Sequence, residues 1–369
     1  MTAIFSSKDL SFTQLYLRFI SDSNRGRRLQ PNGKRISAGT VKNYEYTLQI
    51  IQRFCNEKNF LLRIRPARKL NRRELQTEKN YWKKFYKRFT DYLYDDCGFY
   101  DNYAGHHIKN LKVFFNYLSK ELLPGAGDFH KQFYVRKEEI PIFPLMPEEL
   151  SFLIYNKEFD VLLKPRMKEV KDFFVFGCTV ALRFSDLVSL KRSNIRIIND
   201  QHYLSVRSIK TDTDTLVKLP SYAVDIISRY SKLKNRLLPV FNNVNLNKYI
   251  KQLLEYSGFI HPVIVTRGRR GKRYELKKLL DNGKQIFRFC DVATTHTMRR
   301  TAITTMLSLG VPEPVVRKIS GHAPGSKEFY RYVSWAQTYQ DQETEKMFEK
   351  LQRKRLEVTE KLYLGAHSF

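Results

Sequence analysis

The chain has 369 residues, 42% of them hydrophobic, so it is long enough for a packed core and for two domains. Lys and Arg number 66 against 37 Asp and Glu, and the net charge of +29 points to a polyanionic partner, either nucleic acid or an anionic membrane surface. The longest apolar run, residues 173–182, is about half the length of a membrane-spanning helix, which excludes a membrane span.

The positive charge is spread along the chain. Residues 1–140 carry 27 basic and 14 acidic side chains, and residues 141–369 carry 39 and 23, so a basic tail on a neutral enzyme is excluded and both halves are expected to contact the polyanion. The four cysteines are far apart without a C-x-x-C pair, and the first residues lack a charged start before an apolar core. We therefore expect reduced thiols, no zinc site, no secretory signal and a cytoplasmic protein.

The first half is predicted to be a helical domain at residues 1–136. Apolar residues at helical spacing predict a helix at residues 10–20, a second one that Ser37 or Thr40 caps, and two more at residues 72–97 and 103–120. The helix at residues 72–97 is densely basic and aromatic. It is either an ordinary solvated amphipathic helix or a face that holds phosphates.

An extended connector is predicted at residues 137–147, which contain three prolines. The second domain is placed at residues 148–369. It is expected to begin with a helix at residues 148–154, followed by a buried apolar helix at residues 170–182.

In the middle of the second domain the sequence pattern changes from helical spacing to the alternation typical of strands. Alternating apolar and polar residues at 203–209 and 215–219 predict a small antiparallel hairpin, with a third strand at residues 195–198. The strongly basic run at residues 267–273 is expected to be a flexible loop that touches phosphate without specificity.

Five short stretches of the second half carry groups suited to chemistry on a phosphate. An arginine follows the buried helix, a lysine ends the alternating strand, a histidine and an arginine share a helix face at i and i+3, a histidine follows a glycine, and a tyrosine pair comes last. Each has an ordinary explanation, such as a salt bridge from the first arginine, an exposed hairpin lysine or a packing tyrosine. The residues are Arg183, Lys210, His296 with Arg299, His322, and Tyr330 with Tyr332.

In this order and spacing, the five stretches resemble the tyrosine recombinase (phage integrase) family. The resemblance covers residues 147–336, and more loosely the helical domain from residue 11, which looks like the core-site DNA-binding domain of the family. It implies a mainly α fold with a small antiparallel β-sheet, in which a helical N-terminal DNA-binding domain precedes the catalytic domain. It also implies an enzyme that breaks and rejoins DNA strands.

The resemblance implies a role for each residue. Arg183 and Arg299 would clamp the phosphate, because a planar guanidinium contacts phosphate oxygens in bidentate fashion and keeps its proton. His296 would assist the attacking tyrosine as base or orienter, Lys210 would protonate the leaving 5′ oxygen, and His322 would hydrogen-bond the phosphate. The attack would give a 3′-phosphotyrosine. No metal or cofactor is expected, because no metal-ligand set is visible and the arginines would stabilise the charge.

The nucleophile is the one position where the chain departs from the pattern. In this family the tyrosine commonly falls nine residues after the histidine of the Gly-His step, and here that position holds Arg331, between Tyr330 and Tyr332. The residues Pro324-Gly325 account for one extra residue in the loop. We therefore predict Tyr332 as the nucleophile and a packing role for Tyr330.

The predicted function is site-specific recombination of double-stranded DNA, as in the integration or excision of a mobile element. A homotetramer on paired DNA sites is expected, in the bacterial cytoplasm and bound to the nucleoid. An invertase or a dimer-resolving recombinase stays open, and so do a topoisomerase of the related tyrosine type and a non-catalytic DNA-binding regulator on the same fold. The amphipathic tail at residues 341–364 is expected to pack either on its own domain or on a neighbouring protomer.

Overall fold

The structure, a computed structural model, describes residues 10–209, 213–280 and 283–365, and side chains up to Glu349. The chain divides into two compact units. The first contains the residues up to Ile140 together with Val265–Leu276, and the second contains Pro141–Ile264 and the residues from Lys277 onward. Within the described part of the chain, no helix is both long enough and apolar enough to cross a membrane.

The first unit is mostly helical. Two of its helices, α3 and α4, continue into a π-helical turn, so the helix predicted at residues 72–97 ends its α-helical part at Asp91. Its elements are β1 (Leu10–Ser11), α1 (Phe12–Asn24), α2 (Ala38–Glu57), β2 (Arg63–Ile64), η1 (Ala67–Lys69), α3 (Arg72–Asp91), η2 (Tyr92–Asp96), α4 (Asp101–Tyr117), η3 (Leu118–Leu122), η4 (Phe129–Gln132), β7 (Val265–Arg269) and β8 (Lys272–Leu276).

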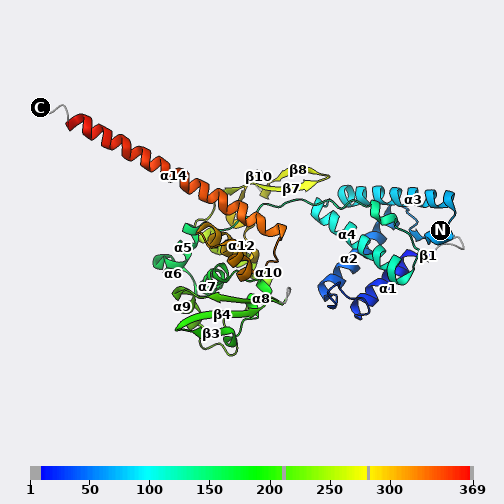
Figure 1. The fold of residues 1–369 in the computed structure, drawn as a ribbon, viewed down its shortest axis with the longest axis horizontal. Helices are drawn as coiled ribbons and strands as arrows, with labels where there is room; N and C mark the ends of the chain where they lie inside the picture. Colours follow the sequence, from blue (N-terminus) through cyan, green and yellow to red (C-terminus); the bar gives the residue numbers. More distant parts are fainter. Residues whose placement is uncertain (1–9, 210–212, 281–282, 366–369) are drawn as a thin grey trace. The chain divides into compact units, whose positions relative to one another are not determined.

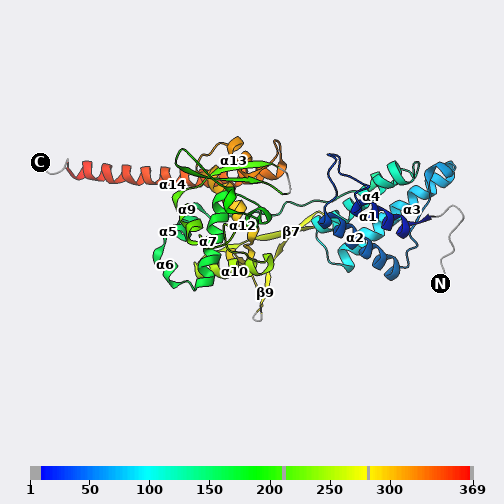
Figure 2. The same ribbon diagram turned by 90° about the horizontal axis from the view of Figure 1, so that it is seen from below.

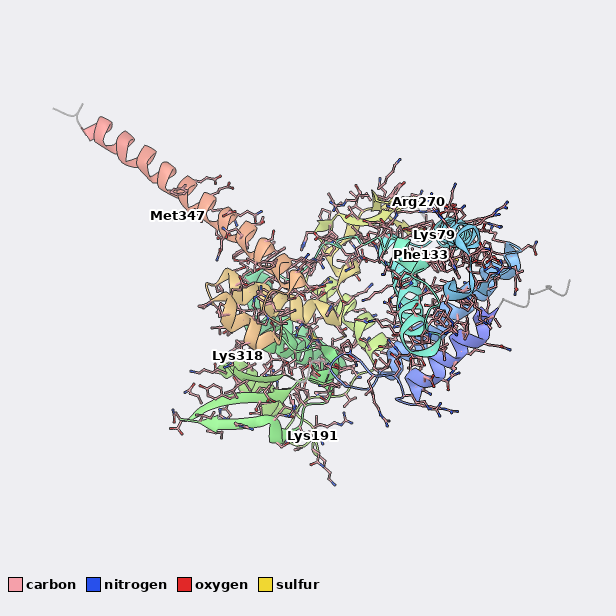
Figure 3. All side chains as sticks on the ribbon, turned by 45° about the vertical axis from the view of Figure 1, so that its right-hand side comes forward. Lys79, Phe133, Lys191, Arg270, Lys318 and Met347 are labelled. Atoms are coloured by element: carbon pink, nitrogen blue, oxygen red, sulfur yellow. The ribbon has the colours of Figure 1, made fainter. Side chains whose placement is uncertain are left out.

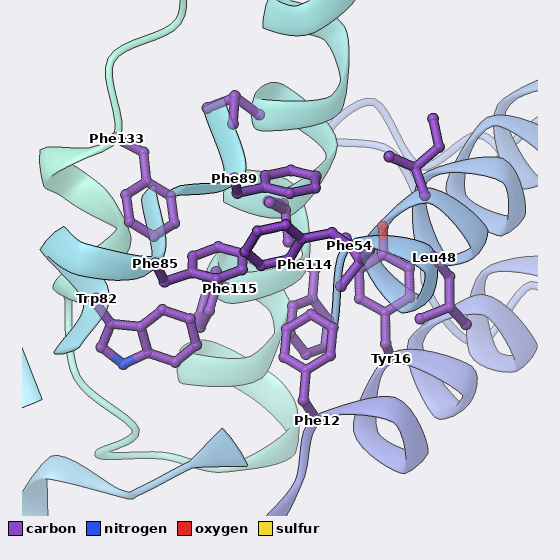
Figure 4. Close-up of a cluster of buried hydrophobic side chains, with 14 of the residues drawn as sticks. Phe12, Tyr16, Leu48, Phe54, Trp82, Phe85, Phe89, Phe114, Phe115 and Phe133 are labelled. Atoms are coloured by element: carbon purple, nitrogen blue, oxygen red, sulfur yellow. The ribbon is translucent and has the colours of Figure 1, made fainter. Parts of the chain in front are cut away.

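Side-chain caps and an aromatic core explain where these helices lie. Ser37, one of the two predicted caps, accepts a hydrogen bond from the backbone of Thr40 at the start of α2 (3.2 Å). The core is built largely from phenylalanine side chains of α1 to α4, which meet edge to face and in tilted pairs (Figure 4). Trp82 of α3 is fully buried among them, against Phe115 of α4. The aromatic residues of α3 therefore form core.

The basic run at residues 267–273 is a β-hairpin, so the prediction of a flexible loop was wrong. Three of its arginines, Arg267, Arg269 and Arg270, are paired with carboxylates of the first unit. Arg267 donates to Glu138 (3.1 Å), and Arg270 donates to Asp95 (2.6 Å). Part of the positive charge of this run is thus neutralised within the protein, because the hairpin belongs to the same unit as these acidic residues.

The second unit combines helices with short antiparallel sheets. Its elements are α5 (Pro147–Tyr155), α6 (Lys157–Leu162), α7 (Pro165–Val180), α8 (Phe184–Val188), η5 (Arg192–Asn194), β3 (Ile195–Ile198), β4 (Gln201–Arg207), β5 (Asp214–Lys218), α9 (Ser221–Arg229), α10 (Asn243–Tyr256), β6 (Pro262–Val263), β9 (Lys278–Leu280), β10 (Gly283–Gln285), β11 (Phe287–Arg288), α11 (Phe289–Val292), α12 (Thr295–Ser308), α13 (Glu313–Ser320) and α14 (Lys327–Gly365). The predicted fold class, mainly α with a small antiparallel sheet, is confirmed.

Helices α7 and α12 form the centre of the second unit (Figure 1). The predicted buried helix is α7, whose last three turns are almost entirely buried. A glycine allows the close approach of the two helices, since a Cβ atom at Gly177 would lie 2.5 Å from the sulfur of Met298. This packing fixes the start of α12 against the end of α7, where the candidate site lies.

The predicted three-stranded sheet is confirmed. Its order is β3-β4-β5, with both pairs antiparallel and with Leu204 opposite Val217. These two side chains and Val206 are buried, so one face of the sheet packs inward. The turn between β4 and β5 contains Lys210, which lies outside the described residues.

The chain ends in one long helix, α14. Its first turns are packed in the second unit, whereas the side chains of residues 341–349 are all exposed. Figures 1 and 2 show this helix projecting from the rest of the second unit, and Figure 3 shows Met347 on the projecting part. Met347 and Phe348 are 47% and 55% exposed, so this stretch does not pack on its own unit.

Candidate active site in the second unit

Arg183 reaches the end of strand β4 because the chain turns sharply after α7. Ala181, the residue that ends α7, is left-handed (φ 56°), and Arg183 is extended and caps the short helix α8. The half-buried side chain of Arg183 then donates a hydrogen bond to the hydroxyl of Ser208 (3.1 Å). An arginine is thus held at the base of the β4–β5 turn.

Asp186 binds the end of strand β4 next to Arg183. Its carboxylate accepts a hydrogen bond from the Ser208 hydroxyl (3.0 Å) and another from the backbone N–H of Ile209 (3.0 Å). Asp186 is 1% exposed, so both bonds form away from solvent. They fix the two residues that precede Lys210, and they place the start of that turn beside Arg183.

Arg299 is buried in the second turn of α12 and is 4% exposed. It donates to the carbonyl oxygen of Ala181 (2.7 Å) and to that of Ser320 (2.6 Å), and so joins the end of α7 to the end of α13. Burial, and secondarily the charge of Arg183, lower the pKa of Arg299 to about 10. The guanidinium is therefore still charged near neutral pH, and two neighbouring cations are available to an anion.

His322 lies against Arg299 and is oriented by the end of α13. That helix ends at Gly321 in the left-handed conformation (φ 62°), which returns the chain toward Arg299. The Nδ1 atom of His322 is 2.8 Å from the hydroxyl of Ser320, and both ring nitrogens are 3.4 Å from the Arg299 guanidinium. Burial and then nearby arginines, Arg299 first, lower the pKa of His322 to about 4, so the ring is neutral near neutral pH.

The two candidate tyrosines have different surroundings. Tyr332 is 7% exposed, and its ring centroid lies 5.9 Å from that of His322. Tyr330 is 54% exposed, and its ring lies 5.2 Å from the guanidinium carbon of Arg317. A tyrosine two residues away on a helix points about 200° around the axis, which explains why only one of them faces His322.

The structure thus brings four of the six predicted residues together, namely Arg183, Arg299, His322 and Tyr332. His296 lies one turn before Arg299 on α12, with an exposed side chain, whereas Arg299 is buried. Its backbone N–H is bonded to the capping hydroxyl of Thr294 (3.2 Å). The structure does not describe Lys210, the sixth residue.

Several supporting residues of the site carry no distinctive signal in the sequence. Asp186 looks like an ordinary acid beside Arg183, although its carboxylate accepts a hydrogen bond from Ile209, just before Lys210. Ser208 and Arg317 also lack a distinctive signal, since a serine at the end of a strand and an arginine in a helix are ordinary features. Across residues 10–209, 213–280 and 283–349, no three His, Cys, Asp or Glu side chains are grouped as a metal ion would need. Two close cations, a neutral imidazole and a phenol are groups suited to binding a phosphate and attacking it.

Comparisons with known proteins identify similar sequences and folds. Residues 156–338 match the model of the phage integrase family. A tyrosine recombinase of Thermosipho africanus (strain TCF52B) is 28% identical over 221 residues, which are 58% of this chain and 66% of the relative, just under two thirds of its length.

Solved structures with a similar fold include three DNA complexes. The XerH recombinase bound to its difH substrate has a TM-score of 0.54 at 13% identity, covering 87% of this chain and 93% of XerH. A lambda integrase dimer bound to a core site has a TM-score of 0.55 at 14% identity, covering 88% of this chain and 95% of that integrase. The Tn1549 transposon integrase in complex with transposon-end DNA has a TM-score of 0.55 at 16% identity, covering 88% of this chain and 94% of that integrase. At sequence identities of 13–16%, this similarity shows a shared fold only. Residues 156–338 of the chain thus form a domain of the phage integrase family, and the chain shares the fold of the tyrosine recombinases.

Proposed function

We propose that this protein is a site-specific recombinase that cuts and rejoins duplex DNA through a covalent 3′-phosphotyrosine. One observation carries the proposal. Tyr332 is buried beside His322, which in turn contacts the Arg299 guanidinium, so a phenol, an imidazole and a cation converge in one place. The net charge of +29 supports a DNA partner.

Arg183 and Arg299 bind the non-bridging oxygens of the scissile phosphate. Negative charge grows on these oxygens in the transition state, and cations that are already in position stabilise it without reorganisation. Arg299 is held by the carbonyl oxygens of Ala181 and Ser320, and Arg183 by the hydroxyl of Ser208, which accounts for this preorganisation.

The Tyr332 oxygen attacks the phosphorus, and the bond from phosphorus to the 5′ oxygen breaks. The tyrosine proton is taken up with the help of His296, and Lys210 protonates the departing 5′ oxygen. His322 contributes a hydrogen bond to the phosphate. The reverse attack by a 5′ hydroxyl releases the tyrosine, so rejoining needs no external energy source.

We further propose that four copies of the chain act on two paired DNA sites, in the integration or excision of a mobile element. Lambda integrase has been solved as a tetramer on a Holliday junction, and its dimer shares this fold. The exposed apolar residues Met347 and Phe348 on α14 support contact with a neighbouring protomer. The four free cysteines and the basic charge fit action on DNA in the bacterial cytoplasm.

A covalent trap tests the chemistry. The protein is incubated with nicked duplexes that carry the two ends of its own genetic element, and denaturant-resistant protein–DNA adducts are counted on a gel. We expect an adduct from the wild type and from Tyr330→Phe, and none from Tyr332→Phe. Specific binding without any adduct would favour the non-catalytic regulator. Relaxation of supercoiled plasmid by monomers, without pairing of sites, would favour the topoisomerase.

A further inference from the structure

Arg317, in the last turn of α13, is buried although it carries a charge. The residue is 9% exposed. A buried charge is costly unless it is paired, and here Nε of Arg317 donates to Glu313, one turn earlier, at 2.6 Å. Such a pair shows that the fold holds this guanidinium in one place.

The guanidinium connects α13 to the loop that follows it. It donates to the carbonyl oxygen of Ala323 (3.3 Å), and the backbone carbonyl of Arg317 accepts the N–H of His322 (3.0 Å). The side chain and the backbone of one residue therefore bind two consecutive residues of the loop that runs from α13 to α14. The position of His322 depends on both bonds.

The same guanidinium holds the first turn of α14. Its carbon lies 4.1 Å from the ring centroid of Phe329 and 5.2 Å from that of Tyr330. Phe329 is fully buried, and its ring centroid lies 5.2 Å from that of His322 and 6.0 Å from that of Tyr332. The ring of Phe329 thus lies between the Arg317 guanidinium and both His322 and Tyr332.

These contacts fix the rotation of α14 about its own axis. With Phe329 and Tyr330 both held against Arg317, Tyr332 is directed to His322. A rotation of the first turn would move Tyr332 away from His322. An ångström-scale displacement of a reacting group is enough to slow a reaction by about 100-fold.

We infer that Arg317 is a positioning residue that selects Tyr332 over Tyr330 as the attacking group, by holding the loop at Ala323 and the first turn of α14 in one arrangement. The inference rests on the proposed function, because it concerns which tyrosine becomes joined to DNA. It adds a residue that touches neither the phosphate nor the attacking oxygen.

The test replaces Arg317 by methionine, which retains an apolar contact with Phe329 but loses the bonds to Glu313 and Ala323. The rate of adduct formation on the nicked duplex is measured together with the DNA dissociation constant. We expect the rate to fall by about 10- to 100-fold while the dissociation constant changes by less than about 2-fold. Val315→Ala, a change at a half-exposed position of the same helix, should leave both values unchanged.

Peptide mapping of the adduct supplies a readout that a general loss of stability would not change. In the wild type all adduct should map to Tyr332, whereas Arg317→Met should yield a detectable share on Tyr330. Arg317→Lys, which can keep the pair with Glu313 but not the planar contact with Phe329, should give an intermediate rate. If Arg317→Met does not fold, the rate and the peptide mapping of Arg317→Lys still test the role of Arg317.

Three outcomes are decisive. Wild-type rate and mapping in both variants would overturn the role of Arg317 while leaving the proposed function intact. A loss of adduct only in proportion to the loss of folded protein, measured by thermal unfolding, would show a merely structural role. An absence of adduct from the wild type would instead count against the proposed function itself.

Discussion

Asp186 accepts a hydrogen bond of 3.0 Å from Ser208, and through it the start of α8 is tied to the end of strand β4. Ser208 in turn accepts a hydrogen bond from Arg183, so the carboxylate, the hydroxyl and the guanidinium form one chain. The second oxygen of Asp186 binds the N–H of Ile209. A single buried acid therefore positions both Arg183 and the residue that precedes Lys210.

Asp186→Asn should impair cleavage without impairing DNA binding. The amide cannot accept both hydrogen bonds, so one donor is left unsatisfied at a buried position, at a cost of about 1–3 kcal/mol. We expect adduct formation on nicked DNA to slow by about 10- to 100-fold. The exposed Asp225→Asn on α9 is the matched control. A normal rate in Asp186→Asn would show that the strand end keeps its position without this acid.

Arg183 and Arg299 should differ in how they respond to substitution. Arg183→Ala should lose cleavage by at least about 100-fold and keep duplex binding and stability, because its side chain is only half-buried. Arg299→Ala should lose cleavage and also lower the thermal unfolding temperature, since it leaves the carbonyl oxygens of Ala181 and Ser320 without a partner. Equal loss of DNA binding in both variants, measured by gel shift, would contradict a role in the chemical step.

The protein should become less stable in mild acid because of His322. Burial, followed by the charges of neighbouring arginines, lowers the pKa of His322 to about 4, whereas an unfolded histidine has a pKa of about 6.5. Between these values the unfolded state binds more protons, so the free energy of unfolding falls as the pH falls from about 6.5 to about 4.

His322→Gln removes this contribution, and urea unfolding near pH 7 and near pH 5 should show a smaller loss of stability than in the wild type. Some loss should remain, because burial and then the charge of His106 also lower the pKa of His107, in the first unit, to about 4. An equal loss in the variant and the wild type would mean that folding does not lower the pKa of His322.

Local signals in the sequence predicted most of the helices and the three-stranded sheet. Hydrophobic periodicity and a capping serine, Ser37, are properties of neighbouring residues, and so is the alternation at residues 203–209. The grouping of Arg183, Arg299, His322 and Tyr332 was predicted from their order along the chain and the family resemblance.

Contacts between distant segments could not be predicted. The hairpin β7–β8 belongs with the first unit because Arg267 and Gly271 find carboxylates at Glu138 and Asp101, more than a hundred residues earlier. Arg317 resembles any arginine on a helix until Phe329 packs beneath it. In both cases the partners become known only when the fold is known.

Gly177 controls how closely α7 and α12 approach, and this distance sets the position of Arg299. A Cβ atom at Gly177 would lie 2.5 Å from the sulfur of Met298 and 3.1 Å from Leu187, too close for either to remain in place. Overpacking of this kind destabilises a core by about 1–3 kcal/mol. We expect Gly177→Ala to lower the free energy of unfolding by that amount, measured with urea, and to slow adduct formation because α12 carries Arg299.

A double-mutant cycle identifies the cause. Met298→Ala alone should cost about 2–5 kcal/mol, because Met298 is 1% exposed and its loss leaves a cavity. If the clash at Met298 explains the effect, the added methyl group of Gly177→Ala fills part of that cavity, and the double variant should lose less stability than the sum of the two single variants. Additive losses would show that Gly177→Ala acts elsewhere, through Leu187 or through the conformation of α7.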